Sequence, residues 1–166
     1  VMEVLGKRLG RYGLKLHPDK TRLVPFERPT RRQQGGKGPG TFDFLGFTLY
    51  WRRTPWGSFR PACKTRHARL TRAINAVTAW CRRHRHQAIK DQHAALKRRL
   101  VGHFNYFGVL GNRSSLQLLV HHAERAWHKW LCRRSHKAHL NWKRSKALLR
   151  DYPLPRPEVL IDLGAT

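Results

Sequence analysis

Arginine and lysine are the residues of this sequence whose number and spacing indicate a chemical role, because their side chains bind phosphate. The 166-residue chain has 35 Lys and Arg against 9 Asp and Glu, which gives a formal net charge of +26. A small domain with this excess repels itself, and the phosphates of a polyanion relieve the repulsion. The charge argues against most small-molecule enzymes and favours nucleic acid as the partner.

Some of these basic residues have the spacing of a binding surface. On a helical wheel of residues 66–84, one flank of the apolar stripe carries Arg69, Arg72 and Arg83, a row that can follow a phosphate backbone. Further basic clusters contain Lys97, Arg98, Arg99, Arg133, Arg134, Lys143 and Arg144. Solvated helix faces also carry charge runs, but only two acids, Asp91 and Glu124, lie between residues 64 and 150. We therefore predict that these clusters contact phosphate.

Acids, histidines and aromatic residues offer weaker chemistry. Acid–base or two-metal chemistry needs clustered carboxylates, whereas Asp19 and Asp43 are more typical of a turn and a strand edge. Cys81 and His84 could share a helix face, but no further ligands follow at zinc spacing. We predict no catalytic and no metal-ligating residue. The tryptophans among the basic clusters are predicted to belong to the core; they are Trp127, Trp130 and Trp142.

Cysteine usage and hydropathy indicate the compartment. The three cysteines are too few and too widely spaced for a disulfide framework, which favours a reducing environment. No apolar run is long enough to span a membrane, and the N-terminal residues lack the apolar core of a signal peptide. We expect a cytoplasmic location and no membrane partner.

The elements that must position the basic residues change in type near residues 62–65. Before this point we expect a helix ending near Gly13, two short strands within residues 14–26 and a mobile loop over 27–40. A β-hairpin should follow, with strands within 42–51 and 58–63. After it, amphipathic helices are expected around 70–81, 96–107 and 116–131, the third capped by Ser114 or Ser115, and a shorter helix over 141–152. The sequence predicts an α+β fold.

Four stretches of the sequence carry a family resemblance. They are LGRYGLKLHPDKT at 9–21, FDFLGF at 42–47, LVGHFNYFGV at 100–109, and Arg133-Arg134-Ser135 followed by Trp142 and Pro153-Leu154-Pro155. Together they resemble the C-terminal part of group II intron-encoded reverse transcriptases, the class also called intron maturases. The first stretch resembles the palm motif that follows the catalytic aspartates, and the second resembles the primer grip. The third resembles the maturase-specific thumb, and the fourth resembles the end of that thumb.

The resemblance implies a division of the chain and roles for individual residues. Residues 1–62 would be the C-terminal part of the palm with the primer-grip hairpin, and 63–166 the maturase-specific thumb. Lys20 matches a lysine that approaches the outgoing pyrophosphate in such polymerases. Leu45, Gly46 and Phe47 would form the turn that holds the primer strand, with Gly46 letting backbones approach closely. Phe104 and Phe107 stand where tyrosines are common, so no hydroxyl contact is expected from them.

The function implied by the resemblance is RNA binding in a ribonucleoprotein. The chain would bind group II intron RNA to promote splicing, through arginine and lysine contacts to phosphate. In a full-length parent, which uses magnesium, it would also hold the RNA/DNA template-primer for RNA-directed DNA synthesis. The catalytic aspartates of the family do not occur in the chain, so we expect no cofactor and no polymerase activity from it alone.

The chain begins within a helical pattern, so we expect a fragment or a truncated reading frame of a mobile genetic element. Two alternatives stay open. One is a standalone nucleic-acid-binding splicing cofactor, and the other is an inactive remnant of a mobile element. The upstream genomic sequence distinguishes a fragment from a standalone protein, because a fragment would be preceded by an in-frame fingers and palm segment and a standalone protein by a ribosome-binding site.

Overall fold

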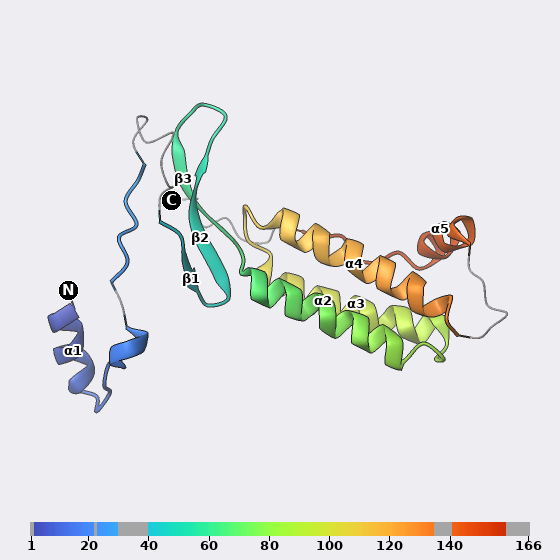
Figure 1. Cartoon of the computed structure of the whole chain (residues 1–166), viewed down its shortest axis with the longest axis horizontal. Coiled ribbons are helices and arrows are strands. Elements are labelled where there is room, and N and C mark those ends of the chain that lie inside the picture. Colours follow the sequence, from blue (N-terminus) through green and yellow to red (C-terminus); the bar gives the residue numbers. More distant parts are fainter. Residues whose placement is uncertain (1, 22, 30–39, 135–140, 159–166) are drawn as a thin grey trace.

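A small antiparallel sheet lies beside a group of longer helices in the computed structural model (Figure 1). The structure describes residues 2–21, 23–29, 40–134 and 141–158, without the side chains of Lys20 and Trp142. The elements are α1 (Met2–Gly10), the 3-10 helix η1 (Pro18–Lys20), β1 (Phe42–Phe44), β2 (Phe47–Arg53), β3 (Phe59–Thr65), α2 (His67–Arg83), α3 (Ile89–Phe107), α4 (Arg113–Leu131) and α5 (Trp142–Asp151). The predicted α+β class is confirmed.

The sheet contains two hairpins in the order β1-β2-β3. Phe44 pairs with Phe47, so Leu45 and Gly46 alone form the turn between β1 and β2. Both residues have positive φ, 47° and 85°, as a type I′ turn requires, and this turn type matches the twist of the flanking strands. The predicted hairpin is confirmed by β2 and β3, but its first strand is interrupted at residues 45–46 by this additional turn.

The two strands predicted within residues 14–26 are wrong. Among the described residues 14–21 and 23–29 the structure has no strand, and Pro18 begins η1. Phe26 instead packs on the sheet, with ring centroids 5.1 Å from both Phe42 and Trp51. Leu14 and Leu23 of the predicted strands are exposed, so their alternation with polar residues does not mark a strand here.

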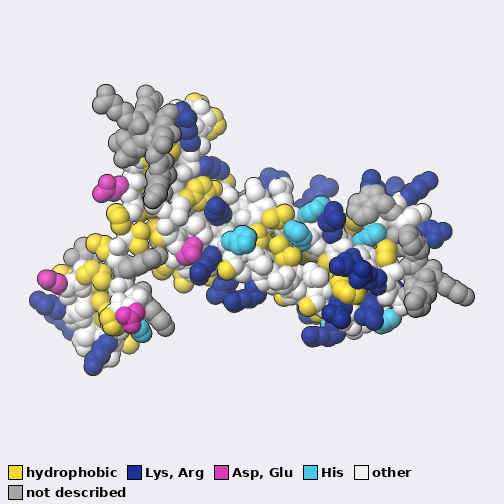
Figure 2. All heavy atoms as spheres, in the orientation of Figure 1, with side chains coloured by type: hydrophobic (Ala, Val, Ile, Leu, Met, Phe, Trp, Pro, Cys, Tyr) yellow, Lys and Arg dark blue, Asp and Glu magenta, His cyan; other side chains and the backbone are white. Residues whose placement is uncertain are grey.

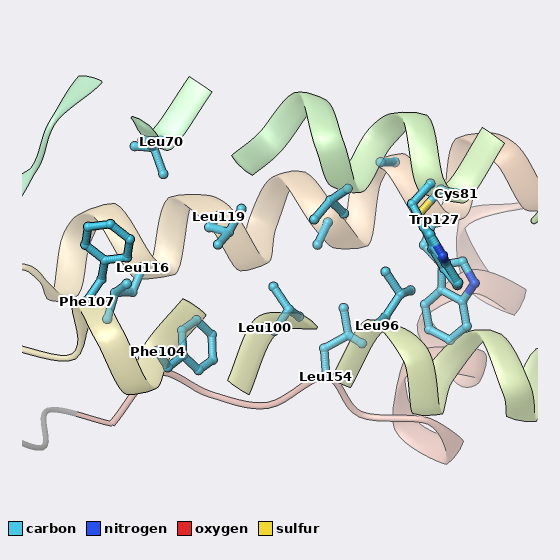
Figure 3. Close-up of a cluster of buried hydrophobic side chains, with 14 of the residues drawn as sticks. Leu70, Cys81, Leu96, Leu100, Phe104, Phe107, Leu116, Leu119, Trp127 and Leu154 are labelled. Atoms are coloured by element: carbon cyan, nitrogen blue, oxygen red, sulfur yellow. The ribbon is translucent and has the colours of Figure 1, made fainter. Parts of the chain in front are cut away.

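The helices bury one continuous core, which confirms the predicted amphipathic faces. Figure 3 shows side chains of α2, α3 and α4 meeting between the helices, with Leu154 added from the segment after α5. Trp127 is 1% exposed, as predicted for a core residue, and its Nε1 donates to Oε1 of the buried Gln92 over 2.9 Å. The Gln92 amide in turn donates to the Gln87 carbonyl over 2.8 Å. No described helix is long and apolar enough to cross a membrane.

Asn112 joins the sheet to the helices. Its Oδ1 accepts from the Thr65 backbone N–H over 2.7 Å, and its Nδ2 donates to Thr65 Oγ1 and to the Phe107 carbonyl, each over 2.8 Å. The residue is completely buried. The prediction that Ser114 or Ser115 caps α4 is wrong, because the helix begins at Arg113 directly after this asparagine.

Candidate nucleic-acid interface

A first hollow lies between the β1–β2 turn and helices α2 and α3. Its volume is about 610 Å³, and we call it the turn groove. It is lined by Leu45, Gly46, Arg69, Arg72, Ala73, Ala76, His103, Tyr106 and Phe107. The predicted turn at 45–46 and two of the three arginines predicted in one row, Arg69 and Arg72, are thereby brought to one place, whereas Arg83 lies elsewhere.

The turn is held against α3 by aromatic residues. The Tyr106 hydroxyl donates to the Leu45 carbonyl over 2.9 Å. Phe47, which follows the turn in β2, lies 6.0 Å from Tyr106 and 5.1 Å from Phe107 between ring centroids. Phe104 and Phe107 are buried in the core, so the hydroxyl contact comes from Tyr106, a residue that the sequence analysis missed because it lies off the apolar stripe of its helix.

Gly46 is required for a different reason from the one expected. The atoms nearest to a Cβ built at this position belong to the side chains of Phe107 and Arg69, at 3.6 and 3.7 Å, and not to another backbone. Those distances are ordinary contacts. The positive φ therefore favours glycine here.

Substitution of Gly46 tests this explanation. Gly46→Ala should lower the free energy of unfolding by about 1–2 kcal/mol, because a Cβ is unfavourable at positive φ. Gly46→Asn should lose less, since asparagine adopts this conformation more readily. Urea denaturation of both variants measures the difference. Equal losses would contradict the backbone explanation and point to side-chain crowding.

His103 is one of the residues that line the turn groove. Its ring stacks on Phe107 with centroids 4.5 Å apart. Its Nε2 is buried and has no hydrogen-bond partner among the described residues. Burial lowers the pKa of His103, so the imidazole is neutral near pH 7. The charge of this groove therefore comes from Arg69 and Arg72.

Two further hollows lie between α2 and α4, with volumes of about 840 and 550 Å³, and both are lined in part by Thr78. We call their combined surface the basic groove. Its lysines and arginines are Arg82, Arg83 and Arg85 from the end of α2 and the residues after it, and Arg125, Lys129 and Arg133 from α4 and the residues after it. Figure 2 shows Lys and Arg side chains gathered at the end of the helices away from the sheet.

Trp130 lines the smaller of the two hollows. Cations from both surround its ring: Arg82 at 5.6 Å, Lys129 at 5.7 Å and Arg133 at 5.4 Å from the centroid. Each distance is within the range of a cation–π interaction. Trp130 is half-buried and packs against the core, in agreement with the predicted core role, but it also holds three cations at the rim of the groove.

The cations of the basic groove pair with no carboxylate in the described part of the chain. The ion pairs among the described residues are Arg66 with Asp43, at 2.9 Å, and His17 with Asp19, at 4.0 Å, and neither lies in this groove. Glu124 is the only acid in α4, and burial raises its pKa. Burial also lowers the pKa of His128 at the wall, with Arg125 adding to the effect. The groove therefore presents positive charge to an external anion.

The other residues predicted to contact phosphate are dispersed. Arg134 donates from Nη2 to the carbonyls of His86 and Gln87, over 3.1 and 2.8 Å, so it ties down the α2–α3 connection. Arg99 lies 4.9 Å over the Trp80 ring. Exposed residues that line neither groove are Lys97 and Arg98 on α3 and Lys143 and Arg144 on α5. The side chain of Lys20 lies outside the described residues.

The remaining candidates from the sequence, Asp43, Cys81 and His84, have contacts that are typical of structural residues. Asp43 accepts from Thr48 Oγ1 over 2.6 Å and pairs with Arg66. Cys81 is buried, and burial raises its pKa to about 12. His84 stacks on Trp80 and contacts its carbonyl. Within the described parts of the chain no three His, Cys, Asp or Glu side chains are grouped to hold a metal ion.

Comparisons with known proteins return no family model, no curated protein and no solved structure that matches this chain.

Proposed function

We propose that this chain is the RNA-binding maturase and thumb segment of a group II intron reverse transcriptase. In this role it binds intron RNA to promote splicing and, within a longer parent, holds the template-primer for DNA synthesis. The observation that carries the RNA part of the proposal is the basic groove, where five of the six lysines and arginines are exposed and none pairs with a carboxylate of the described residues.

The spacing of these cations suits a phosphate backbone. Arg125, Lys129 and Arg133 follow one another at intervals of four residues, so the first two lie about 6 Å apart along α4. Guanidinium groups bind phosphate through paired N–H donors. Because phosphates carry no sequence information, these contacts would fix the position of the RNA rather than read its bases.

The turn groove supports the primer-grip part of the proposal. Arg69 and Arg72 would bind phosphate beside the β1–β2 turn, and Tyr106 keeps the turn in place from α3. In a full-length parent, magnesium would serve polymerisation. The role proposed for this chain is to bind and position nucleic acid.

Salt dependence tests the binding. If five to eight phosphates are contacted, the logarithm of the affinity for structured RNA should fall against the logarithm of the salt concentration with a slope of roughly 4 to 7, at about 0.7 to 0.9 per contact. Filter binding of a folded group II intron RNA across a salt series measures the slope. A flat response would overturn the proposal.

The maturase part is tested separately with the same RNA. At a magnesium concentration too low for the intron to splice alone, added chain should restore splicing, whereas an unrelated basic protein of similar charge should not. Salt-sensitive binding without any gain in splicing would leave RNA binding in place and remove the maturase role.

A further inference from the structure

The side chain of Trp56 is much more exposed than is usual for a tryptophan. It lies in the loop between β2 and β3, which Figure 1 shows at the end of the sheet away from the helices. Its exposed fraction is 85%, the largest among the exposed large hydrophobic side chains of the described residues. Tryptophan is usually well buried, so a fully presented indole suggests that a ligand covers it.

The loop that presents Trp56 is closed by a set of hydrogen bonds. The Thr54 backbone N–H donates to the Ser58 carbonyl over 2.8 Å, and the Gly57 N–H donates to the Thr54 carbonyl over 3.0 Å. The Thr54 and Ser58 hydroxyls lie 2.7 Å apart, and the Ser58 N–H donates to Thr54 Oγ1 over 3.2 Å. A loop that is already ordered loses little further conformational freedom on binding.

The same hairpin places like charges opposite each other. Arg52 pairs with Arg60 in the β2–β3 register, so their side chains share one face of the sheet, and both are exposed. Like charges directly opposite are destabilising. No carboxylate of the described residues pairs with either guanidinium. Lys64 lies 5.4 Å over the Tyr50 ring on this face, which adds to the positive charge.

We propose that the β2–β3 hairpin binds an unpaired stretch of RNA, with one base stacked on Trp56 and the backbone phosphate held between Arg52 and Arg60. An exposed indole stacks on any base, and a phosphate would relieve the repulsion between the two arginines. Bases within a duplex have their faces covered, so an unpaired base is the form that fits. The inference rests on the proposed RNA binding, but it adds a site remote from the basic groove.

The test uses the full chain and two RNA probes, a hairpin RNA and the same hairpin with an unpaired oligoadenylate tail. Trp56→Ala should weaken binding of the tailed probe by about 5-fold to 100-fold and leave the affinity for the tail-less hairpin unchanged. Trp56→Phe should retain most of the affinity. The control is Tyr12→Ala, which removes an aromatic side chain that is 81% exposed elsewhere and should change neither affinity.

The arginine pair gives a second variant. Arg52→Gln with Arg60→Gln should lower the salt slope for the tailed probe by about 1 unit, and the thermal midpoint should stay equal or rise because a like-charge pair is removed. If the wild-type chain binds both probes and Trp56→Ala loses nothing, the hairpin site is overturned while RNA binding stands. If Trp56→Ala instead abolishes self-association, the indole is a protein contact and the inference is wrong. If the wild-type chain binds neither probe, the proposed function fails as well.

Discussion

Replacing Arg125, Lys129 and Arg133 with glutamine should lower the affinity for structured RNA about 100-fold at ~0.1 M salt and reduce the salt slope by roughly 2 to 3 units. Each lost phosphate contact removes about 0.7 to 0.9 from that slope. All three side chains are exposed, so the variant should remain folded, although Trp130 loses two of its cation contacts. Filter binding across a salt series, with circular dichroism, measures both effects.

A second triple variant tests whether the loss of affinity comes from the basic groove or from the lower net charge of the protein. Changing Lys143, Arg144 and Lys146 of α5 to glutamine removes the same three charges from exposed positions that line neither groove. The loss of affinity should be clearly smaller. An equal loss in the two triple variants would mean diffuse electrostatic attraction and would contradict the basic groove as the binding surface.

Asn112→Ala should lower the free energy of unfolding by about 3–5 kcal/mol. The substitution leaves the Thr65 N–H, the Thr65 hydroxyl and the Phe107 carbonyl without their partner in a buried position. Each buried group left unsatisfied costs about 1–3 kcal/mol. Domains of this size are stable by only about 5–15 kcal/mol, so urea denaturation should show the change clearly.

Asn141 provides the comparison for this substitution. It also accepts a hydrogen bond from a backbone N–H, that of Arg144 over 2.9 Å, but it is an exposed helix cap. Asn141→Ala should cost about 1 kcal/mol. If the two alanine variants lose the same stability, Asn112 is not the joint between sheet and helices that its three hydrogen bonds indicate.

The helices and the β2–β3 hairpin could be predicted from the sequence because each is formed by residues that lie close together in the chain. A helix repeats every 3.6 residues, so the buried face of α4 is visible in the spacing of Leu116, Leu119 and Trp127. The strands predicted before residue 27 were wrong: Leu14 and Leu23 of the alternating pattern are exposed, and Phe26 packs on the sheet from outside it. A periodic signal cannot distinguish a side chain that pairs within a sheet from one that packs on it.

The contacts that build the candidate site depend on residues far apart in the chain, and these were only partly predictable. Asn112 meets Thr65 across 47 residues, and nothing in its own neighbourhood indicates that partner. Arg83 and Arg133 were expected to bind phosphate, but their meeting in one groove requires α2 to pack on α4. The interval of four residues that links Arg125, Lys129 and Arg133 is visible in the sequence and would have found two further members of the groove.

Helix α2 contributes to both grooves, and it is one uninterrupted helix. Arg72 lies in the turn groove and Arg83 in the basic groove, eleven residues apart in α2, which corresponds to about 16 Å along the helix axis. A rigid helix cannot change this separation to suit its ligand. An RNA that occupies both grooves must therefore present two backbone segments at that spacing, so the protein would distinguish RNAs by the distance between their folded strands and not by their bases.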